Sequence, residues 1–145
     1  MSDHRILLVE DRPADVRLTK RALAKAGFTG ALTVAENGRV ALDMLLQRGA
    51  YAGTPLPHLI LLDWMMPLVN GHEVLIEMRK HEHLKMLPVV VLTTSKSAMD
   101  IEAAYADGCN AYLVKPVDPD DFQKTMDALG LFWLSAAVLP GRKSP

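Results

Sequence analysis

The chain has 145 residues, of which half are hydrophobic and 23% are charged, a composition typical of a globular domain that excludes a disordered or fibrous protein. Its 16 Lys and Arg residues nearly balance its 17 Asp and Glu residues, so no strong field of either sign exists to attract nucleic acid or anionic lipid. The single cysteine, Cys109, excludes an internal disulfide, and the absence of a secretion signal or an apolar stretch of bilayer length predicts a soluble cytoplasmic protein without nucleic-acid or membrane partners.

The first half of the chain alternates short apolar runs with segments of helical periodicity. Residues 6–9 form an apolar run typical of a strand, and residues 14–26 then place apolar side chains at helical spacing until Gly27. Residues 31–35 predict a second strand, and residues 38–48 predict a second helix. A unit of one strand and one helix therefore occurs twice in succession.

The second half repeats this unit three more times. The longest connection, residues 50–58, is predicted to be a loop because it contains one glycine and two prolines. Residues 59–62 are apolar at every position, which predicts a strand near the centre of the sheet, covered by helices on both faces. The remaining elements are predicted at residues 71–80 (helix), 88–92 (strand), 98–107 (helix), 111–114 (strand) and from Pro119 onward (helix). Five such units predict an α/β fold of the flavodoxin-like class, a doubly wound five-stranded parallel sheet with strand order 2-1-3-4-5.

Charged residues directly follow three of the predicted strands. Glu10 and Asp11 follow the first strand, Asp63 the third and Lys115 the fifth. Because the carboxyl ends of parallel strands form one edge of a sheet, these side chains are predicted to share a pocket. Mg²⁺ is held in proteins by one or two carboxylates with waters and a phosphate oxygen, so the cluster predicts an Mg²⁺ site. Lys115 would supply a point cation for a phosphoryl oxygen.

Each member of this cluster also has an ordinary structural interpretation. Glu10 and Asp11 could cap the first helix, and Asp63 could begin a turn, because acidic residues are common at both places. Their joint occurrence at three strand ends in the correct order favours the shared site.

Four strings in the chain resemble the receiver domains of two-component response regulators, the group to which the chemotaxis regulator belongs. They are ILLVED at 6–11, LILLDWMMPLVNG at 59–71, LPVVVLTT at 87–94 and YLVKP at 112–116. The resemblance covers approximately residues 4–130 and predicts a single receiver domain over residues 1–145, with 131–145 as an apolar C-terminal extension.

The resemblance implies a role for each member of the cluster. Asp63 would accept a phosphoryl group from a histidine kinase and form an aspartyl phosphate, a recognised form of covalent capture. Asp11, Asp63 and the main-chain carbonyl of Met65 would bind Mg²⁺, and Glu10 would assist through a water molecule. Lys115 would contact the phosphoryl oxygens. The protein would be a signalling phosphoacceptor with only intrinsic autophosphorylation and autodephosphorylation activity, and not an enzyme with a separate substrate.

The resemblance also implies a switch. Thr93 would move to hydrogen-bond the new phosphoryl group, and Tyr112 would turn inward, which changes the surface offered to other proteins. The peptide bond between Lys115 and Pro116 is expected to be cis. Met65 replaces the asparagine often found two residues after the phosphoacceptor, so the lifetime of the phosphoryl group does not follow from the resemblance.

The end of the chain is unusually apolar. The string FWLSAAVLP, together with the segment before the third strand, resembles the single-domain response regulators that pair with bacterial and cyanobacterial phytochromes. That narrower resemblance implies a red-light-sensing kinase as partner and a homodimer. The dimer contact is predicted at Phe132, Trp133, Leu134 and Leu139, because an exposed apolar end must be covered, and packing against its own domain is the alternative.

The predicted function is that of a stand-alone response regulator, which acts on a downstream protein that the sequence does not identify. The first alternative is a phosphorelay intermediate that passes the phosphoryl group to a histidine phosphotransfer protein. A haloacid-dehalogenase-like phosphatase would need a second aspartate where Met65 stands, and a flavodoxin would not place two carboxylates in its first phosphate-binding loop.

Overall fold

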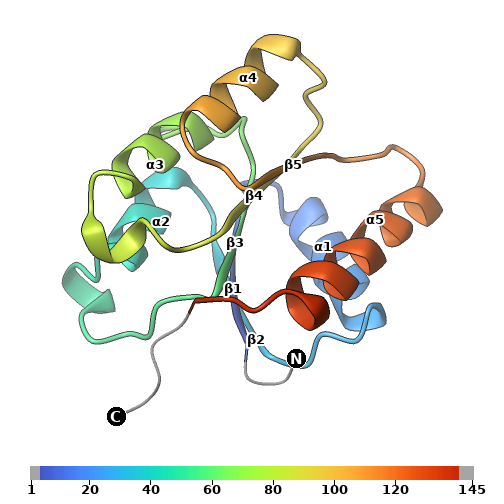
Figure 1. The fold of residues 1–145 in the computed structure, drawn as a ribbon, viewed down its shortest axis with the longest axis horizontal. Helices are drawn as coiled ribbons and strands as arrows, with labels where there is room; N and C mark the ends of the chain where they lie inside the picture. Colours follow the sequence, from blue (N-terminus) through green and yellow to red (C-terminus); the bar gives the residue numbers. More distant parts are fainter. Residues whose placement is uncertain (1–3, 141–145) are drawn as a thin grey trace.

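The computed structural model describes residues 4–140 of the chain. Five strands form one parallel sheet in the order β2-β1-β3-β4-β5, which confirms the predicted fold class (Figure 1). The strands are β1 (Arg5–Val9), β2 (Ala31–Ala35), β3 (Leu59–Leu62), β4 (Val89–Thr93) and β5 (Ala111–Val114). The helices are α1 (Pro13–Lys25), α2 (Gly38–Leu45), α3 (Gly71–Met78), α4 (Ala98–Ala106) and α5 (Pro119–Leu131). No helix within residues 4–140 is long and apolar enough to cross a membrane.

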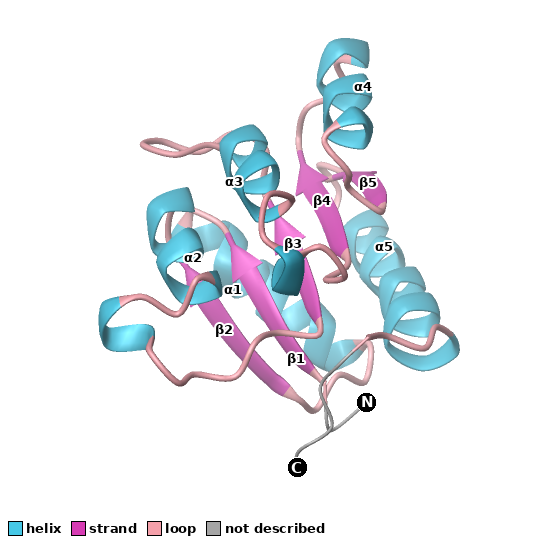
Figure 2. Ribbon diagram, turned by 60° about the vertical axis from the view of Figure 1, so that its left-hand side comes forward, coloured by secondary structure: helices cyan, strands magenta, loops and turns pink. Residues whose placement is uncertain are grey.

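Helices cover both faces of the sheet, as the apolar strands require. Figure 2 shows α2 and α3 in front of the sheet and α1 and α5 behind it. Alternate residues of each central strand enter two separate cores, one beneath α2, α3 and α4 and the other beneath α1 and α5. All four residues of β3 have 0% exposure, as predicted for the central strand. Burial of a leucine contributes about 2 kcal/mol, so β3 is a rigid support for the residue that follows it.

Helix α2 is shorter than its sequence pattern predicts. The pattern extends to residue 48, but the helix ends at Leu45 and Leu46 forms its C-cap. Gln47 then adopts a φ of 55°, a left-handed conformation that no α-helix continues. A single 3-10 turn, Gly49–Tyr51, begins the long connection to β3. Part of the sheet next to β2 is therefore covered by this connection and not by a helix.

The apolar end of the chain is partly folded onto its own domain. A π-helical turn, Phe132–Ala136, continues from α5. Leu134 is only 2% exposed, and Trp133 and Leu139 pack against the core beneath α1 and α5. Leu134 therefore fills a place in its own core, and its predicted contact with a second subunit stays a prediction. Residues 141–145 of the predicted extension lie outside the described residues.

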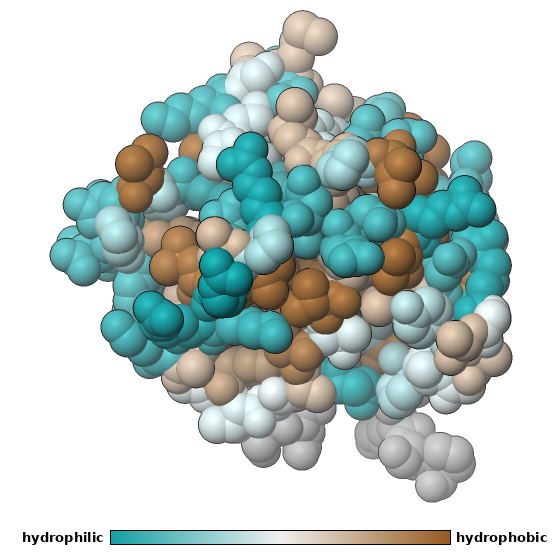
Figure 3. All heavy atoms as spheres, turned by 180° about the vertical axis from the view of Figure 1, so that it is seen from behind, coloured by the Kyte–Doolittle hydropathy of each residue, from teal (hydrophilic) through white to brown (hydrophobic). Residues whose placement is uncertain are grey.

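Other apolar side chains of this end remain at the surface. Phe132 is 57% exposed, and Leu131 and Val138 are exposed to a greater extent. Hydrophobic side chains also reach the surface in several separate groups on the face drawn in Figure 3, between hydrophilic ones. The end of the chain therefore has two sets of apolar side chains, one packed on the core of the domain and one exposed to solvent.

A half-buried arginine joins three segments of the chain at the edge of the α3 side. The guanidinium of Arg79, which follows α3, donates to the main-chain carbonyls of Leu84 (3.2 Å), Lys85 (3.0 Å), Leu87 (3.1 Å) and Gly108 (2.7 and 3.2 Å). Without the guanidinium the carbonyl of Leu84 keeps the amide of Leu87 as a donor, but the other carbonyls lose the arginine donor. An unsatisfied buried acceptor costs about 1–3 kcal/mol. One side chain thus connects the end of α3, the segment before β4 and the turn before β5.

We expect Arg79→Met to lower the free energy of unfolding by about 2–4 kcal/mol, because several carbonyls lose their donor at once. Arg79→Lys should lose roughly half as much free energy of unfolding as Arg79→Met, since an ammonium supplies a charge but not the planar set of donors. Urea denaturation measures both changes. Lys80→Met is the matched control, because Lys80 is exposed and makes only a surface ion pair with Glu77 at 3.6 Å. Equal midpoints for Arg79→Met and Lys80→Met would contradict the structural role of Arg79.

Candidate functional site

The main chain of the sheet places the acidic residues. Val9 lies beside Leu62 in the register of β1 and β3, so the residues that follow these strands are neighbours. The ladder continues past the strand ends, where the amide of Asp63 donates to the carbonyl of Val9 and the amide of Glu10 donates to the carbonyl of Ala35, each at 3.0 Å. The position of the acidic residues is therefore set by backbone hydrogen bonds and not by a mobile loop.

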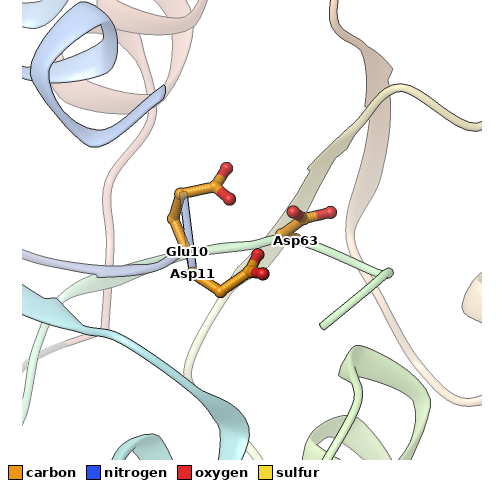
Figure 4. Close-up of side chains that lie close together, drawn as sticks. All are labelled: Glu10, Asp11 and Asp63. Carbon is orange, nitrogen blue, oxygen red and sulfur yellow. The ribbon is translucent and has the colours of Figure 1, made fainter. Parts of the chain in front are cut away.

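Three carboxylates gather at this edge of the sheet, as predicted. Oxygen atoms of Glu10, Asp11 and Asp63 all lie within 4.8 Å of one another (Figure 4). Glu10 and Asp63 are 2% and 7% exposed, and the buried Oδ1 atom of Asp11 has no hydrogen-bond partner within residues 4–140. A buried oxygen without a donor is costly unless a cation or water meets it.

The residues present fit a hard divalent cation. The donor set consists of oxygen atoms alone, which Mg²⁺ prefers, and the buried oxygen of Asp11 that has no protein donor is suited to a cation. The amide of Met65 donates to Oδ1 of Asp63 at 3.2 Å, so the main chain of Met65 lies beside the cluster. That the carbonyl of Met65 binds the metal stays a prediction.

Lys115 enters the same pocket from the end of β5. Its ammonium donates to Oε1 of Glu10 in a short hydrogen bond and lies 3.3 Å from Oδ2 of Asp15 and 3.9 Å from Oδ2 of Asp63. Burial alone would lower the pKa of Lys115, but the hydrogen bond and charge of Glu10, together with the two aspartates, raise it above its ordinary value. Lys115 is therefore a fixed cation in this pocket.

Asp15 is a member of the site that the sequence argument did not single out. It lies in the first turn of α1, and its carboxylate reaches Lys115 from a third direction. The available signal was an acidic residue one turn beyond the Glu10-Asp11 pair, but acidic residues are common in the first turn of any helix. Only the packing of α1 against the strand ends distinguishes Asp15 from an ordinary first-turn residue.

The pKa of Glu10 is raised to about 7, first because of burial and then because of the charge of Asp63, while Lys115 opposes the change. The folded protein therefore binds a proton on Glu10 more tightly than the unfolded chain does. The contribution of protonated Glu10 to the free energy of unfolding is fully present below about pH 4.5 and is lost as the pH rises through about 7.

We expect Glu10→Gln to remove this pH dependence from the metal-free protein, because an amide does not ionise. The stability of Glu10→Gln relative to the original protein should rise between pH 4.5 and 7 by an amount on the order of 2 kcal/mol, which allows for screening by water near the pocket. Denaturation in a chelator at several pH values measures the difference. Glu82→Gln, at an exposed residue paired with Lys85, is the control. Parallel stability curves for Glu10→Gln and the original protein would contradict the raised pKa.

The two predicted switch residues lie on the neighbouring strands β4 and β5. Thr93 is fully buried at the end of β4, and its hydroxyl has no hydrogen-bond partner within the described part of the chain. The hydroxyl of Tyr112 donates to the carbonyl of Ser95 at 3.0 Å, two residues beyond Thr93. Burial raises the pKa of Tyr112, so its hydroxyl stays protonated and able to donate. Tyr112 is thus attached to the loop that any movement of Thr93 would displace.

The peptide bond between Lys115 and Pro116 is trans, because residues 4–140 contain no cis peptide bond. The prediction of a cis bond, which came from the resemblance alone, is therefore wrong. A trans bond before proline is intrinsically favoured by about 0.5–1 kcal/mol, and a local sequence does not reveal when tertiary contacts reverse that preference.

An open hollow of about 580 Å³ is lined in part by Trp64 and Met65, the two residues that follow Asp63. The loop after β3 and the start of α4 form its walls, with Trp64, Met65, Asn70, Met99 and Asp100 among the lining residues. Met65 and Met99 are both well exposed there. The hollow therefore opens to solvent beside the segment that follows Asp63.

Comparisons with known proteins identify the family. The sequence matches the response regulator receiver domain over residues 6–127. The probable methanogenesis regulatory protein FilR2 of Methanothrix harundinacea is 43% identical over 137 residues, which cover 94% of this chain and 87% of FilR2. The response regulator Rcp1 of Synechocystis sp. is 41% identical over 135 residues, which cover 93% of this chain and 92% of Rcp1.

Solved structures agree with this match. The phosphorylated cyanobacterial phytochrome response regulator RcpA superimposes with a TM-score of 0.92 at 38% identity, covering 97% of this chain and all of RcpA. The Mn²⁺-bound form of Rcp1 superimposes with a TM-score of 0.90 at 40% identity, covering 95% of this chain and 99% of Rcp1. Receiver domains are phosphorylated by histidine kinases and bind a divalent metal at an acidic pocket. This chain, with its 2-1-3-4-5 sheet and its acidic group at the strand ends, belongs to the response regulator receiver domain family.

Proposed function

We propose that Asp63 accepts a phosphoryl group from a sensor histidine kinase in the presence of Mg²⁺. One observation carries the proposal: Asp63, Glu10 and Asp11 bring carboxylate oxygens within 4.8 Å of one another, and the ammonium of Lys115 lies 3.9 Å from the carboxylate of Asp63. A nucleophilic carboxylate, acidic ligands for a divalent cation and a buried ammonium are the groups that phosphoryl transfer requires.

The chemistry follows from these groups. An oxygen of Asp63 attacks phosphorus, the bond from phosphorus to the donor nitrogen breaks, and its electron pair stays with the leaving imidazole. Asp11, Asp63 and the carbonyl of Met65 would hold Mg²⁺, with Glu10 assisting through water, and bound Mg²⁺ would offset the negative charge of the phosphoryl oxygens. Lys115 then exchanges part of its contact with Glu10 for a phosphoryl oxygen.

Thr93 and Tyr112 would pass the event to the surface. The hydroxyl of Thr93, which has no partner within residues 4–140, donates to a phosphoryl oxygen, and the loop that contains Ser95 moves with it. Because Tyr112 is bonded to that loop, its ring follows and alters the face of α4, β5 and α5. A differential stabilisation of a few kcal/mol is sufficient for such a change of populations.

The direct test is labelling with acetyl phosphate in the presence and absence of Mg²⁺. We expect one phosphoryl group per chain with Mg²⁺ and nearly none with excess chelator. Label that is independent of a divalent cation would contradict the proposed role of the acidic cluster. The autophosphorylation and autodephosphorylation rates follow from the same time course.

The kinase partner is proposed by similarity to the phytochrome response regulator RcpA. A light-sensing phytochrome kinase is the first candidate, although FilR2, with 43% identity, is named for methanogenesis. Transfer from a panel of purified histidine kinases that includes a phytochrome kinase tests the pairing, which fails if another kinase transfers faster. Rapid passage of label onward to a histidine phosphotransfer protein would favour the phosphorelay alternative. As an endpoint regulator or as a phosphorelay intermediate, the protein would act in the cytoplasm.

A homodimer remains a proposal with a narrower contact than the sequence suggested. Phe132 is the one predicted contact residue with a largely exposed side chain, Trp133 and Leu139 are partly buried, and Leu134 is enclosed. Phe132→Ser should therefore weaken self-association without loss of the fold, as measured by light scattering over a range of concentrations. Val117→Ser, at a fully exposed residue, is the control. An unchanged dimer in Phe132→Ser would exclude Phe132 from the contact.

A further inference from the structure

A second cavity lies at the opposite end of the strands from the acidic cluster. It has a volume of about 440 Å³, within the range of small-molecule sites in proteins. The cavity exists because α2 ends at Leu45 and leaves Ala31 and Thr33 of β2 exposed. Figure 2 shows the connection from α2 to β3 crossing in front of the lower parts of β2 and β1. This connection forms the outer wall of the cavity.

The outer wall is held in place by its own hydrogen bonds. The side-chain amide of Gln47 donates to the carbonyl of Thr54 at 2.6 Å, and the hydroxyl of Thr54 donates to the carbonyl of Tyr51 at 2.7 Å. Nε of Arg5 donates to the carbonyl of Leu56 at 2.9 Å, which attaches the same segment to β1. The cavity is therefore a built feature with a fixed wall and not a gap beneath a loose loop.

The inside of the cavity is mostly apolar. Leu7 and Leu45 belong to the core beneath α2, and Met44 packs against that core. Pro55 and Pro57 contribute rigid apolar surface from the outer wall. An apolar ring or branched chain that enters the cavity would bury its surface against both walls, which is the main source of affinity in such sites.

Three polar groups of the lining have no partner that would compete with a ligand. Arg5 has no carboxylate within 4.0 Å in the described part of the chain, and its Nη1 and Nη2 atoms make no hydrogen bond there. The hydroxyls of Thr33 and Tyr51 make none with residues 4–140 either. A half-buried guanidinium with two available nitrogens matches the two oxygens of a carboxylate.

We propose that this cavity binds a small monocarboxylate of about ten to twelve non-hydrogen atoms with an apolar body, a size that a cavity of this volume accommodates. The carboxylate lies on the free edge of the Arg5 guanidinium. The apolar body lies between Met44 and Leu45 on one side and the prolines of the outer wall on the other. This site is separate from the phosphoacceptor pocket and does not depend on the function proposed for Asp63.

The test is an NMR titration of the ¹⁵N-labelled full chain with 4-phenylbutyrate, compared with the neutral analogue 4-phenylbutan-1-ol. We expect saturable shifts at the amides of Leu7, Thr33 and Met44, with a Kd on the order of 1 mM or tighter for the acid. The alcohol, which lacks the charge, should bind at least about 5-fold more weakly, because a charge-assisted bidentate contact is lost. Asp63→Asn should bind the acid with unchanged affinity.

Two variants test the site itself. Arg5→Met should bind acid and alcohol equally, while Arg5→Lys should retain part of the preference for the acid. Thr33→Phe should block both ligands by filling the cavity, at a strand residue where an aromatic side chain is well tolerated. Spectra without ligand show whether each variant is folded. Shifts located at the C-terminal segment, equal binding of acid and alcohol by the original protein, or unimpaired binding by Thr33→Phe would each overturn the proposal.

Discussion

Asp63→Asn should lose at least about three orders of magnitude in its rate of phosphorylation, both from acetyl phosphate and from a cognate kinase. The amide is nearly the same size as the carboxylate, so packing beneath α3 is retained, but it is a poor nucleophile and a poor ligand for a divalent cation. The change also removes the charge of one of three carboxylates whose oxygens lie within 4.8 Å of one another, so the metal-free variant should be at least as stable as the original protein. Phosphoryl incorporation per chain and urea denaturation measure the two effects.

The matched control is Asp43→Asn, at a partly exposed aspartate of α2 that pairs with Arg48 at 3.4 Å. This variant should be phosphorylated at the original rate. If Asp63→Asn were labelled as fast as Asp43→Asn, the phosphoacceptor would be another residue.

Gly71→Ala should impair both the stability of the protein and its phosphorylation. A Cβ atom at Gly71 would lie 2.6 Å from the carbonyl oxygen of Asp63 and 2.8 Å from Cα of Trp64, and both are backbone atoms that cannot rotate away. Overpacking of this kind costs about 1–3 kcal/mol. Because the displaced atoms include the backbone of the proposed nucleophile, we also expect a loss in phosphorylation rate of about 10- to 100-fold.

Gly130→Ala tests whether these effects are specific. At Gly130, in α5, an added Cβ would meet the Cβ of Ala26 at 3.4 Å, which is an ordinary contact. Alanine is the better helix former by about 0.8–1 kcal/mol, so this variant should be as stable as the original protein or slightly more stable. Comparable losses in the two variants would show that close approach to Asp63 is not the cause.

The elements of the fold follow from patterns within a few residues. All five strands are predicted from apolar runs, and β2, β3 and β5 have the predicted bounds. The helices are predicted from periodicity, and the error at the end of α2 arises because Gln47 takes a left-handed conformation that no residue type in that stretch announces. Burial at every position of β3 is likewise readable in advance, since a strand without polar residues must be covered on both faces.

The acidic cluster was predictable for a related reason. In a parallel sheet, topology alone brings the residues after β1 and β3 to one edge, so Glu10, Asp11 and Asp63 meet whatever the details of packing. Their spatial proximity therefore required only the assignment of the strands and not a knowledge of side-chain conformation.

By itself the sequence determined the strands, the order of the layers and the acidic edge of the sheet, because apolar runs, helical periodicity and the residues that follow each strand are local properties. Tertiary structure alone decided that Asp15 reaches Lys115, that Arg79 joins three segments of the chain, and that Leu134 fills its own core. It also decided the trans bond before Pro116 and the cavity beside Arg5. These features depend on distances between side chains remote in sequence, and such distances are set by helix packing and loop path, which no local pattern encodes.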